Sequence, residues 1–158
     1  ERKEIYLPQL IRSASASQCA FDEIRKYMQK SGQSKLSKGK ILLATVKGDV
    51  HDIGKNIVKV VLENYGYEII DLGKDVPVEA IVQTAIEQNI YLIGLSALMT
   101  TTLVSMEETI QALHDSGHPC KIMVGGAVVS PAYAQKIHAD YYAKDAKESA
   151  DIAKEVLG

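Results

Sequence analysis

Short apolar runs alternate with amphipathic stretches from Lys40 to the end of the chain. The runs have the length and composition of strands that are buried on both faces of a sheet. They predict strands at 40–46, 68–72, 91–96, 121–124 and 140–143. Between the runs, apolar residues recur every three or four positions, which is the period of a helix with one buried face. This pattern predicts helices over about 54–65, 78–86, 103–113, 131–137 and 146–157.

A strand followed by a helix, repeated along the chain, is typical of a parallel sheet with helices on both faces. Right-handed crossover connections leave few possible strand orders, and 2-1-3-4-5 is a common order for a sheet of this size. We therefore expect an α/β fold of the flavodoxin or Rossmann-like type. In this order the chain reverses direction between its first and third strands, and ligands bind in the crevice at such a point.

An amphipathic pattern also precedes the predicted sheet. Apolar residues from Leu7 to Met28 recur at helical spacings, and Pro8 is compatible with a first helical turn. The segment that follows is polar, contains glycine and has no period, as in a linker. We expect a remnant helical cap at 1–31, a linker at 32–39 and a main domain at 40–158. Because a helical pattern starts almost at the first residue, we expect the chain to be a piece of a longer protein.

Composition narrows the function classes. Lys and Arg number 18 and Asp and Glu number 20 among 158 residues, so the net charge of −2 favours neither nucleic acid nor an anionic membrane as a partner. No apolar run approaches the roughly 20 residues of a membrane-spanning helix, and no signal-peptide pattern is present. Cys19 and Cys120 lie far apart without C-x-x-C spacing, which argues against a disulfide framework or structural zinc. These features fit the cytoplasm.

Three chemically distinct features follow three different predicted strands. Asp49 and His51 follow the first strand, the hydroxyl-rich run 96–102 ends the third, and a glycine pair ends the fourth. Because the carboxyl ends of parallel strands meet at one edge, we expect these features to lie together. The Asp49 carboxylate can hold one ring nitrogen of His51 while the other nitrogen faces a metal.

The glycines suggest how a large ligand could approach this edge. Gly125 and Gly126 carry no side chains, so a flat ligand could reach the backbone there. Gly54 stands at the start of a predicted helix, whose positive end suits a phosphate. Other interpretations remain open: a turn histidine with a carboxylate partner, a threonine run that only favours strand, or a small divalent-metal site formed by Asp49, His51 and Asp52.

Taken together, the motifs D-x-H-x-x-G (Asp49, His51, Gly54), S-x-L (Ser96, Leu98) and G-G (Gly125, Gly126) resemble the cobalamin-binding domain of corrinoid enzymes. The wider strings at 44–52 and 65–73 resemble cobalamin-dependent methionine synthases, and the resemblance covers nearly the whole chain. The combination from three strand ends is more specific than D-x-H-x-x-G alone.

The resemblance implies a role for each matching residue. His51 would be the lower axial ligand of the cobalt in place of the cofactor's own base, and Asp49 would bind the far nitrogen of His51. The third member of this relay is usually a serine, and Thr102 occupies its position here. Leu7 would lie near the methyl group on the upper face. The remaining implied cofactor contacts are Gly48, Val50 and Asp52 below the corrin ring and Ser96, Leu98, Thr100, Gly125, Gly126 and Ala146 along the nucleotide arm.

The function implied by the resemblance is that of the cobalamin module of a methionine-synthase-like methyltransferase. Such a module carries a methyl group on methylcobalamin from methyltetrahydrofolate to homocysteine, with folate-binding and homocysteine-binding modules as partners in the same or another chain. It would not be active alone. The alternatives are a stand-alone corrinoid protein of a methanol, methylamine or aryl-ether methyltransferase system and the cobalamin domain of a mutase or sensor. A receiver-like signalling domain lacks support, because the pattern of acidic residues that it carries at its first strand does not appear.

Overall fold

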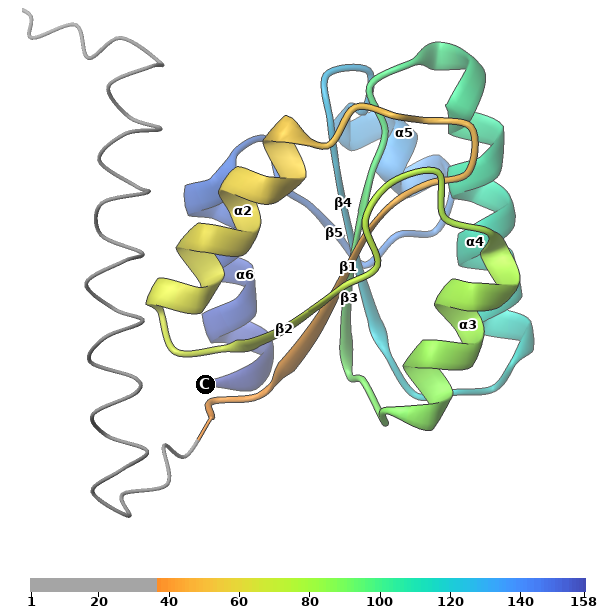
Figure 1. Cartoon of the computed structure of the whole chain (residues 1–158). Helices are drawn as coiled ribbons and strands as arrows, with labels where there is room; N and C mark the ends of the chain where they lie inside the picture. Colours follow the sequence, from red (N-terminus) through yellow and green to blue (C-terminus); the bar gives the residue numbers. More distant parts are fainter. Residues whose placement is uncertain (1–36) are drawn as a thin grey trace, which may run out of the picture. The chain divides into compact units, whose positions relative to one another are not determined.

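The computed structural model describes residues 37–158, which form one compact unit from Ser37 to Gly158. Strands and helices alternate through this unit (Figure 1). The strands are β1 (Lys40–Thr45), β2 (Glu68–Asp71), β3 (Leu92–Ser96), β4 (Lys121–Gly125) and β5 (Tyr141–Tyr142). The helices are α2 (Ile53–Asn64), α3 (Val78–Glu87), the 3-10 turn η1 (Thr100–Thr102), α4 (Leu103–Asp115), α5 (Pro131–Lys136) and α6 (Ala146–Leu157).

The sheet is parallel throughout, with strand order β2-β1-β3-β4-β5. In the register, Leu43 of β1 stands beside Gly94 of β3, and Gly94 stands beside Met123 of β4. Two residues further along, Ser96 of β3 lies between Thr45 and Gly125. The carboxyl ends of β1, β3 and β4 therefore meet at one edge, where ligands bind in folds of this class.

Apolar cores cover the two faces of the sheet. One core joins the sheet to buried residues of α3, α4 and α5, such as Ile81, Met106 and Ala134. The other joins it to α2 and α6 through Leu62, Ala150 and Ala153. Figure 1 shows the same division, with α2 and α6 on one side of the strands and α3 and α4 on the other. The central strands β1, β3 and β4 are buried on both faces, which explains their nearly continuous apolar sequence, whereas the edge strands β2 and β5 are only partly buried.

The helices differ in whether a side chain caps their N-termini, and this difference affects the edge where the carboxyl ends of β1, β3 and β4 meet. The side chain of Ser130 accepts a hydrogen bond from the Tyr133 N–H and caps α5, and Asp145 accepts one from the Glu148 N–H and caps α6. At α2 the N-cap residue Asp52 makes no side-chain cap, and no acidic residue occupies the first turn. The N–H groups of that turn and their partial positive charge are therefore left for other acceptors.

The α/β fold of the flavodoxin or Rossmann-like type and the strand order 2-1-3-4-5 predicted from the sequence are confirmed. The element bounds agree to within one or two residues in most cases. The fifth strand is shorter than predicted, because only Tyr141 and Tyr142 pair with β4. The predicted cap at 1–31, with Leu7, lies outside the described residues, so the division into cap, linker and main domain remains a prediction.

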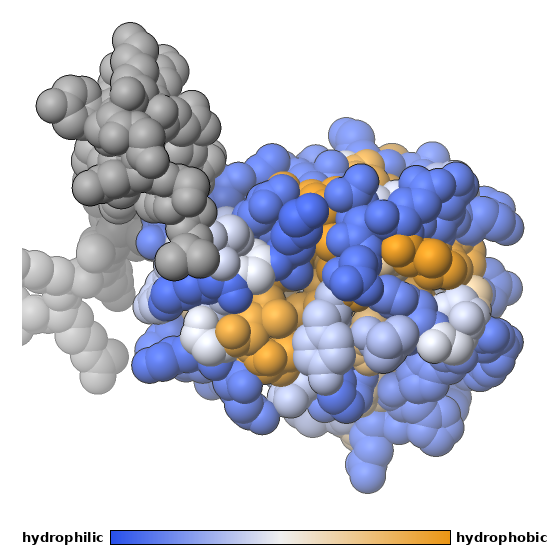
Figure 2. All heavy atoms as spheres, turned by 90° about the horizontal axis from the view of Figure 1, so that it is seen from below, coloured by the Kyte–Doolittle hydropathy of each residue, from blue (hydrophilic) through white to orange (hydrophobic). Residues whose placement is uncertain are grey.

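Figure 2 views the molecule from below Figure 1 and shows the edge opposite the carboxyl ends of the strands. Most of that face is hydrophilic, and its hydrophobic areas are small and separated from one another (Figure 2). Across residues 37–158, none of the helices combines the length and apolar character that a membrane crossing requires.

Candidate functional site

The loop between β1 and α2 is held by backbone hydrogen bonds that place Asp49 inside the protein. The Asp49 N–H donates to the Val46 carbonyl at 3.1 Å, which closes a turn. Gly48 has a φ of +83°, a value that favours glycine. The Gly48 N–H donates to the Asp75 carboxylate at 2.7 Å, and the Asp75 N–H donates to the Asp49 carbonyl at 2.9 Å. The loop is thus tied to the segment after β2.

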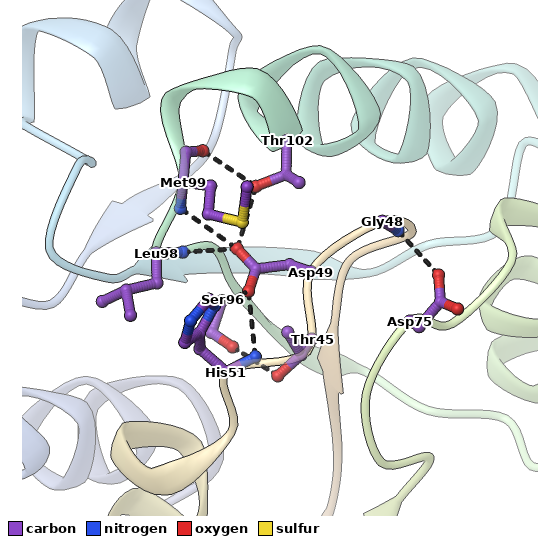
Figure 3. Close-up of polar contacts among 9 residues, drawn as sticks. All are labelled: Thr45, Gly48, Asp49, His51, Asp75, Ser96, Leu98, Met99 and Thr102. Atoms are coloured by element: carbon purple, nitrogen blue, oxygen red, sulfur yellow. Dashed lines mark hydrogen bonds and ion pairs between the residues drawn. The ribbon is translucent and has the colours of Figure 1, made fainter.

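The Asp49 carboxylate is fully buried and accepts hydrogen bonds from two parts of the chain (Figure 3). Its Oδ1 accepts from the backbone N–H of His51 at 3.0 Å and lies 2.9 Å from His51 Nδ1. Its Oδ2 accepts from the backbone N–H groups of Leu98 at 2.7 Å and Met99 at 3.2 Å. Asp49 therefore fastens the β1–α2 loop to the segment that follows β3.

Burial by itself would raise the pKa of Asp49, because it disfavours the charged carboxylate. The hydrogen bonds from Leu98, His51 and Thr102 outweigh burial and hold the pKa of Asp49 well below its usual range. The carboxylate is therefore ionised and acts only as an acceptor. His51 must then carry its proton on Nδ1, which leaves Nε2 with a free lone pair when the ring is neutral.

The His51 ring is in a position to use that nitrogen. Its side chain is 47% exposed, whereas its partner Asp49 is completely buried. The carboxylate thus orients the ring from below while the rest of the ring faces outward, as in the carboxylate–histidine pairs that support metal-bound imidazoles.

Thr102, which the resemblance places third in the relay, contacts the same carboxylate. Its hydroxyl donates to Asp49 Oδ2 at 2.9 Å and also lies 2.8 Å from the Met99 carbonyl oxygen, so one hydroxyl proton is shared between two acceptors. Thr102 is buried, while Thr100 and Thr101 are exposed. The turn η1 produces this difference, because it turns one of three successive threonines inward.

A cavity of about 810 Å³ begins beside His51 and extends along the sheet on the side of α2 and α6. Apolar side chains with large exposed fractions, Val50, Ile53 and Leu98, lie where it meets the surface. Deeper in, its lining includes Leu43, Gly94 and Met123 from three adjacent strands. The volume and apolar lining suit a small organic molecule or a long arm of a larger one.

Most of the residues predicted from the sequence line this cavity. They are Val50, His51, Asp52, Gly54, Ser96, Leu98, Gly125, Gly126 and Ala146. Gly48, Asp49 and Thr102 lie behind the His51 ring in the supporting network, outside the lining. Thr100 does not line the cavity, because η1 begins there and its side chain is exposed.

The glycine pair has a structural reason that the sequence analysis did not identify. At Gly126 the φ is +131°, and a Cβ atom would collide with the backbone carbonyl of Ala97. At Gly125 a Cβ would come 2.9 Å from the Ala143 carbonyl oxygen. The close approach of the protein's own backbone therefore requires both glycines, in addition to any ligand that reaches them.

Sequence reasoning also missed several residues of the site. Thr45 is fully buried, and its hydroxyl is 2.8 Å from that of Ser96, so the hydroxyl of Ser96 has a protein partner. Gly94 lies inside an apolar strand, a position that often marks a close approach, and this signal could have found it. Ser149 of α6 carries no such signal, because a serine in a helix is ordinary.

A buried ion pair stands at the α2 side of the cavity. The ammonium group of Lys55, whose side chain is 2% exposed, lies 2.5 Å from the Asp71 carboxylate, and Lys59 reaches the same carboxylate at 3.2 Å. Burial opposes ionisation of Asp71, but the hydrogen bond and charge of Lys55 lower the pKa of that carboxyl group. This pair ties α2 to the end of β2.

The divalent-metal interpretation finds no support in the structure. Within residues 37–158 there is no group of three or more His, Cys, Asp or Glu side chains that could hold a metal ion. The oxygens of Asp49 are occupied by N–H and O–H donors, so this residue cannot also serve as a metal ligand without losing them. Among the described residues that line the cavity, His51 is the one histidine, and its side chain is about half exposed.

The parallel sheet, the carboxylate-supported histidine and the adjacent cavity define an α/β domain with a ligand site at the carboxyl edge of its sheet. A family model described as the B12 binding domain matches residues 39–152, and the chain belongs to this family. Dimethylamine corrinoid protein 3 of Methanosarcina mazei is 42% identical over 99% of this chain and 95% of its own length. Dimethylamine corrinoid protein 1 of Methanosarcina acetivorans is 42% identical over 99% of this chain and 74% of its own.

Solved structures agree with these relatives. A crystal structure of a cobalamin-binding protein from Desulfitobacterium hafniense superimposes with a TM-score of 0.83 at 37% identity, covering 98% of this chain and 73% of that one. The matching family and the similar proteins show that the cofactor of this chain is cobalamin. They do not support the finer expectation of a methionine-synthase module with folate and homocysteine partners, and they favour the alternative of a corrinoid protein.

The site fits cobalamin in its donor set and in its shape. His51 is the one ring nitrogen presented at the cavity by the described residues that line it, and a buried carboxylate fixes its tautomer. The exposed apolar side chains around it suit the lower face of a flat macrocycle. The cavity behind them has room for an arm that hangs from such a ring.

Proposed function

We propose that this chain is a methyl-carrying corrinoid protein that serves a methyltransferase acting on a methylated amine. The relatives named for dimethylamine match over nearly the whole chain, which supports this substrate class. The observation that best supports this proposal is the series of contacts from Thr102 through Asp49 to His51. These contacts orient the imidazole so that one of its nitrogens is available to bind a cobalt ion. Cobalamin, when bound, supplies a cobalt centre that can accept a methyl group and give it up again.

Each residue of the site has a defined part in this proposal. His51 would hold the cobalt, and Asp49 and Thr102 are positioning residues that would keep its ring in one orientation and tautomer. The loop that contains Gly48, Val50 and Asp52 would hold the corrin ring. The nucleotide arm of the cofactor would be held in the cavity, which is lined by Ser96, Leu98, Gly125, Gly126 and Ala146.

The methyl donor would be selected by a partner rather than by this chain. The proposed partner is a methyltransferase protein, by analogy with the methanol:cobalamin methyltransferase complex of Methanosarcina barkeri. A chain of that complex superimposes with a TM-score of 0.85 at 31% identity, covering 97% of this chain and 58% of that one. In this proposal residues 40–158 bind cobalamin, and the helical cap expected at 1–31 lies outside the described residues.

Electron paramagnetic resonance of the bound Co(II) form tests the ligand assignment. The unpaired electron of Co(II) couples to the base nitrogen that is bound to the cobalt. A ¹⁴N ligand therefore splits each line of the spectrum into three, and a ¹⁵N ligand splits it into two. We expect the doublet pattern when the chain is labelled with ¹⁵N-histidine and bound to unlabelled cobalamin. A triplet in the labelled protein would mean that the cofactor's own base is still the ligand, and the proposal would be wrong.

Methyl transfer tests the substrate class. The chain loaded with Co(I) cobalamin should be methylated in the presence of dimethylamine and a dimethylamine methyltransferase from a methanogen, which is followed by the absorption change of the corrinoid. His51→Ala is the matched control, because it removes the proposed ligand from a half-exposed side chain. Methylation with methanol and a methanol methyltransferase, but not with dimethylamine, would reassign the donor to methanol.

A further inference from the structure

The loop between β1 and α2 that carries His51, residues 46–52, is held from two sides. On one side, the Asp49 carboxylate accepts hydrogen bonds from the segment that follows β3. On the other side lies Asp75, in the segment that follows β2 (Figure 3). The proposed function uses only the first of these supports, and it gives Asp75 no part.

The two hydrogen bonds of Asp75 hold the backbone of this loop. Asp75 Oδ1 accepts from the Gly48 N–H at 2.7 Å, and the Asp75 N–H donates to the Asp49 carbonyl at 2.9 Å. The first contact is to the peptide group before Gly48, and the second is to the peptide group after Asp49. The next residue, Val76, donates its N–H to the Thr45 carbonyl at 3.1 Å, so the segment after β2 continues beside the end of β1.

The backbone of Asp75 has a φ of +53°, a conformation that residues with a Cβ atom rarely adopt. Among the described residues other than glycine, Asn89 and His138 also have a positive φ, and each directly follows the C-cap of a helix, where this conformation is common. Asp75 lies instead in the loop between β2 and α3. Aspartate tolerates this conformation better than most residues, but glycine adopts it without strain, as Gly73 does two positions earlier. A need for the carboxylate explains why an aspartate stands at this position.

The backbone of Asp49 also determines where the His51 ring lies. His51 is two residues further along the chain, and its Nδ1 is 2.9 Å from the Asp49 carboxylate. The segment after β3 fixes the carboxylate end of Asp49, and Asp75 fixes its backbone end. Without the second support the loop could shift and tilt the ring, even with the contacts of the Asp49 carboxylate intact.

We propose that Asp75 is a positioning residue for the cobalt ligand, because it keeps the loop of residues 46–52 in the conformation in which the His51 ring can bind the metal. This inference deepens the proposed function and rests on it, since it requires that His51 be the ligand. Its consequence is electrochemical. Histidine ligation stabilises Co(II), whereas Co(I) holds no axial base, so weaker ligation makes Co(II) easier to reduce and raises the midpoint potential.

The test uses the full chain with bound cobalamin. Asp75→Gly keeps the backbone conformation and the N–H but removes the carboxylate, whereas Asp75→Asn keeps an oxygen that can accept from the Gly48 N–H. Asn89→Gly is the matched control, because Asn89 is also exposed, has a φ of +50° and precedes β3 at the other end of the sheet. Electron paramagnetic resonance of the Co(II) form measures the fraction of molecules with histidine ligation. Spectroelectrochemistry measures the midpoint potential of the Co(II)/Co(I) couple.

In Asp75→Gly we expect the equilibrium constant for histidine ligation to fall about tenfold, as for other groups that support a metal ligand. The midpoint potential should rise by up to about 59 mV, which corresponds to a tenfold change in a one-electron equilibrium. Asp75→Asn should remain close to the parent in both measurements, and Asn89→Gly should match it. In a His51→Ala background, Asp75→Gly should not shift the potential, because Asp75 acts through His51.

Parent-like ligation and potential in Asp75→Gly would overturn the inference. Equal losses in Asp75→Gly and Asp75→Asn, or a shift of the potential by Asp75→Gly in the His51→Ala background, would also overturn it, because the carboxylate would then act through its charge. If Asp75→Gly fails to fold, as judged by circular dichroism, the contact serves the fold and the inference is wrong. A parent chain without histidine ligation would instead contradict the proposed function, so the two failures are distinguishable.

Discussion

Replacing Asp49 with asparagine changes one oxygen to an NH2 group and almost nothing in shape. In the parent, Oδ1 faces two nitrogens of His51, and Oδ2 faces the N–H groups of Leu98 and Met99 and the hydroxyl of Thr102. An amide nitrogen is a donor and cannot accept from any of them. Whichever way the amide turns, at least one buried backbone N–H loses its acceptor.

The expected loss follows from these contacts. An unsatisfied buried donor costs about 1–3 kcal/mol, and hydrogen bonds to a charged acceptor contribute about 1.5–3 kcal/mol each. Because some donors remain bound to the amide oxygen, Asp49→Asn should lower the free energy of unfolding by about 2–4 kcal/mol. For a unit of this size the melting temperature should fall by roughly 8–16 °C.

The assay is urea unfolding of the corrinoid-free chain, followed by far-ultraviolet circular dichroism, with His51→Ala as the control. The His51 side chain is half exposed and makes one of the carboxylate contacts, so its removal should cost less than about 1 kcal/mol. Both variants should lose histidine ligation of cobalt. If Asp49→Asn unfolds within about 1 kcal/mol of the parent, or if His51→Ala is equally destabilised, the carboxylate does not organise the site in the way described.

Three further substitutions test other parts of the structure. Thr102→Val should lower the free energy of unfolding in urea by about 1 kcal/mol, whereas Thr102→Ser, which keeps the hydroxyl donor, should stay closer to the parent. Equal losses of stability in the two variants would contradict the role of the hydrogen bond. Asp71→Asn leaves a buried lysine without its counter-charge and should cost about 3 kcal/mol at pH 7. The control is Asp151→Asn, which breaks an exposed ion pair with Lys147 and should cost much less. Because the folded-state pKa of Asp71 is lowered, its stabilisation is complete above the unfolded value of about 3.9 and is lost as the pH falls through the folded value. The difference between parent and Asp71→Asn in pH-dependent unfolding should therefore shrink below about pH 4, and a constant difference would exclude the ion pair as its cause. Gly126→Ala should lower stability by about 2 kcal/mol or more, because its φ and a neighbouring carbonyl both oppose a side chain, whereas Gly94→Ala should melt near the parent temperature.

The elements and their order could be predicted because they depend on periodicity. A strand buried on both faces must be apolar over its length, and a helix that covers it must be apolar on one side. Handedness of the crossovers then leaves few topologies. The same reasoning brings Asp49, His51, Ser96 and Gly125 to one edge, because the carboxyl ends of parallel strands coincide there.

The detailed partners at that edge depend on turns that periodicity does not describe. The N–H groups of Leu98 and Met99, about fifty positions along the chain, bind Asp49 because two separate loops meet above the sheet. Of three consecutive threonines, Thr102 alone donates to that carboxylate, because a single 3-10 turn rotates it inward. Small changes in torsion angles at such turns redirect a side chain without altering the sequence pattern.

By itself the sequence determined the class of fold, the position of the site and the residue types that could hold a cobalt-bound macrocycle. Only the tertiary structure shows why each glycine is needed. Gly126 avoids a backbone carbonyl, whereas Gly94 leaves room for the ends of the Leu43 and Met123 side chains, and the sequence does not distinguish the two cases. Close packing makes the difference, because the room available to a Cβ atom depends on neighbours from distant parts of the chain.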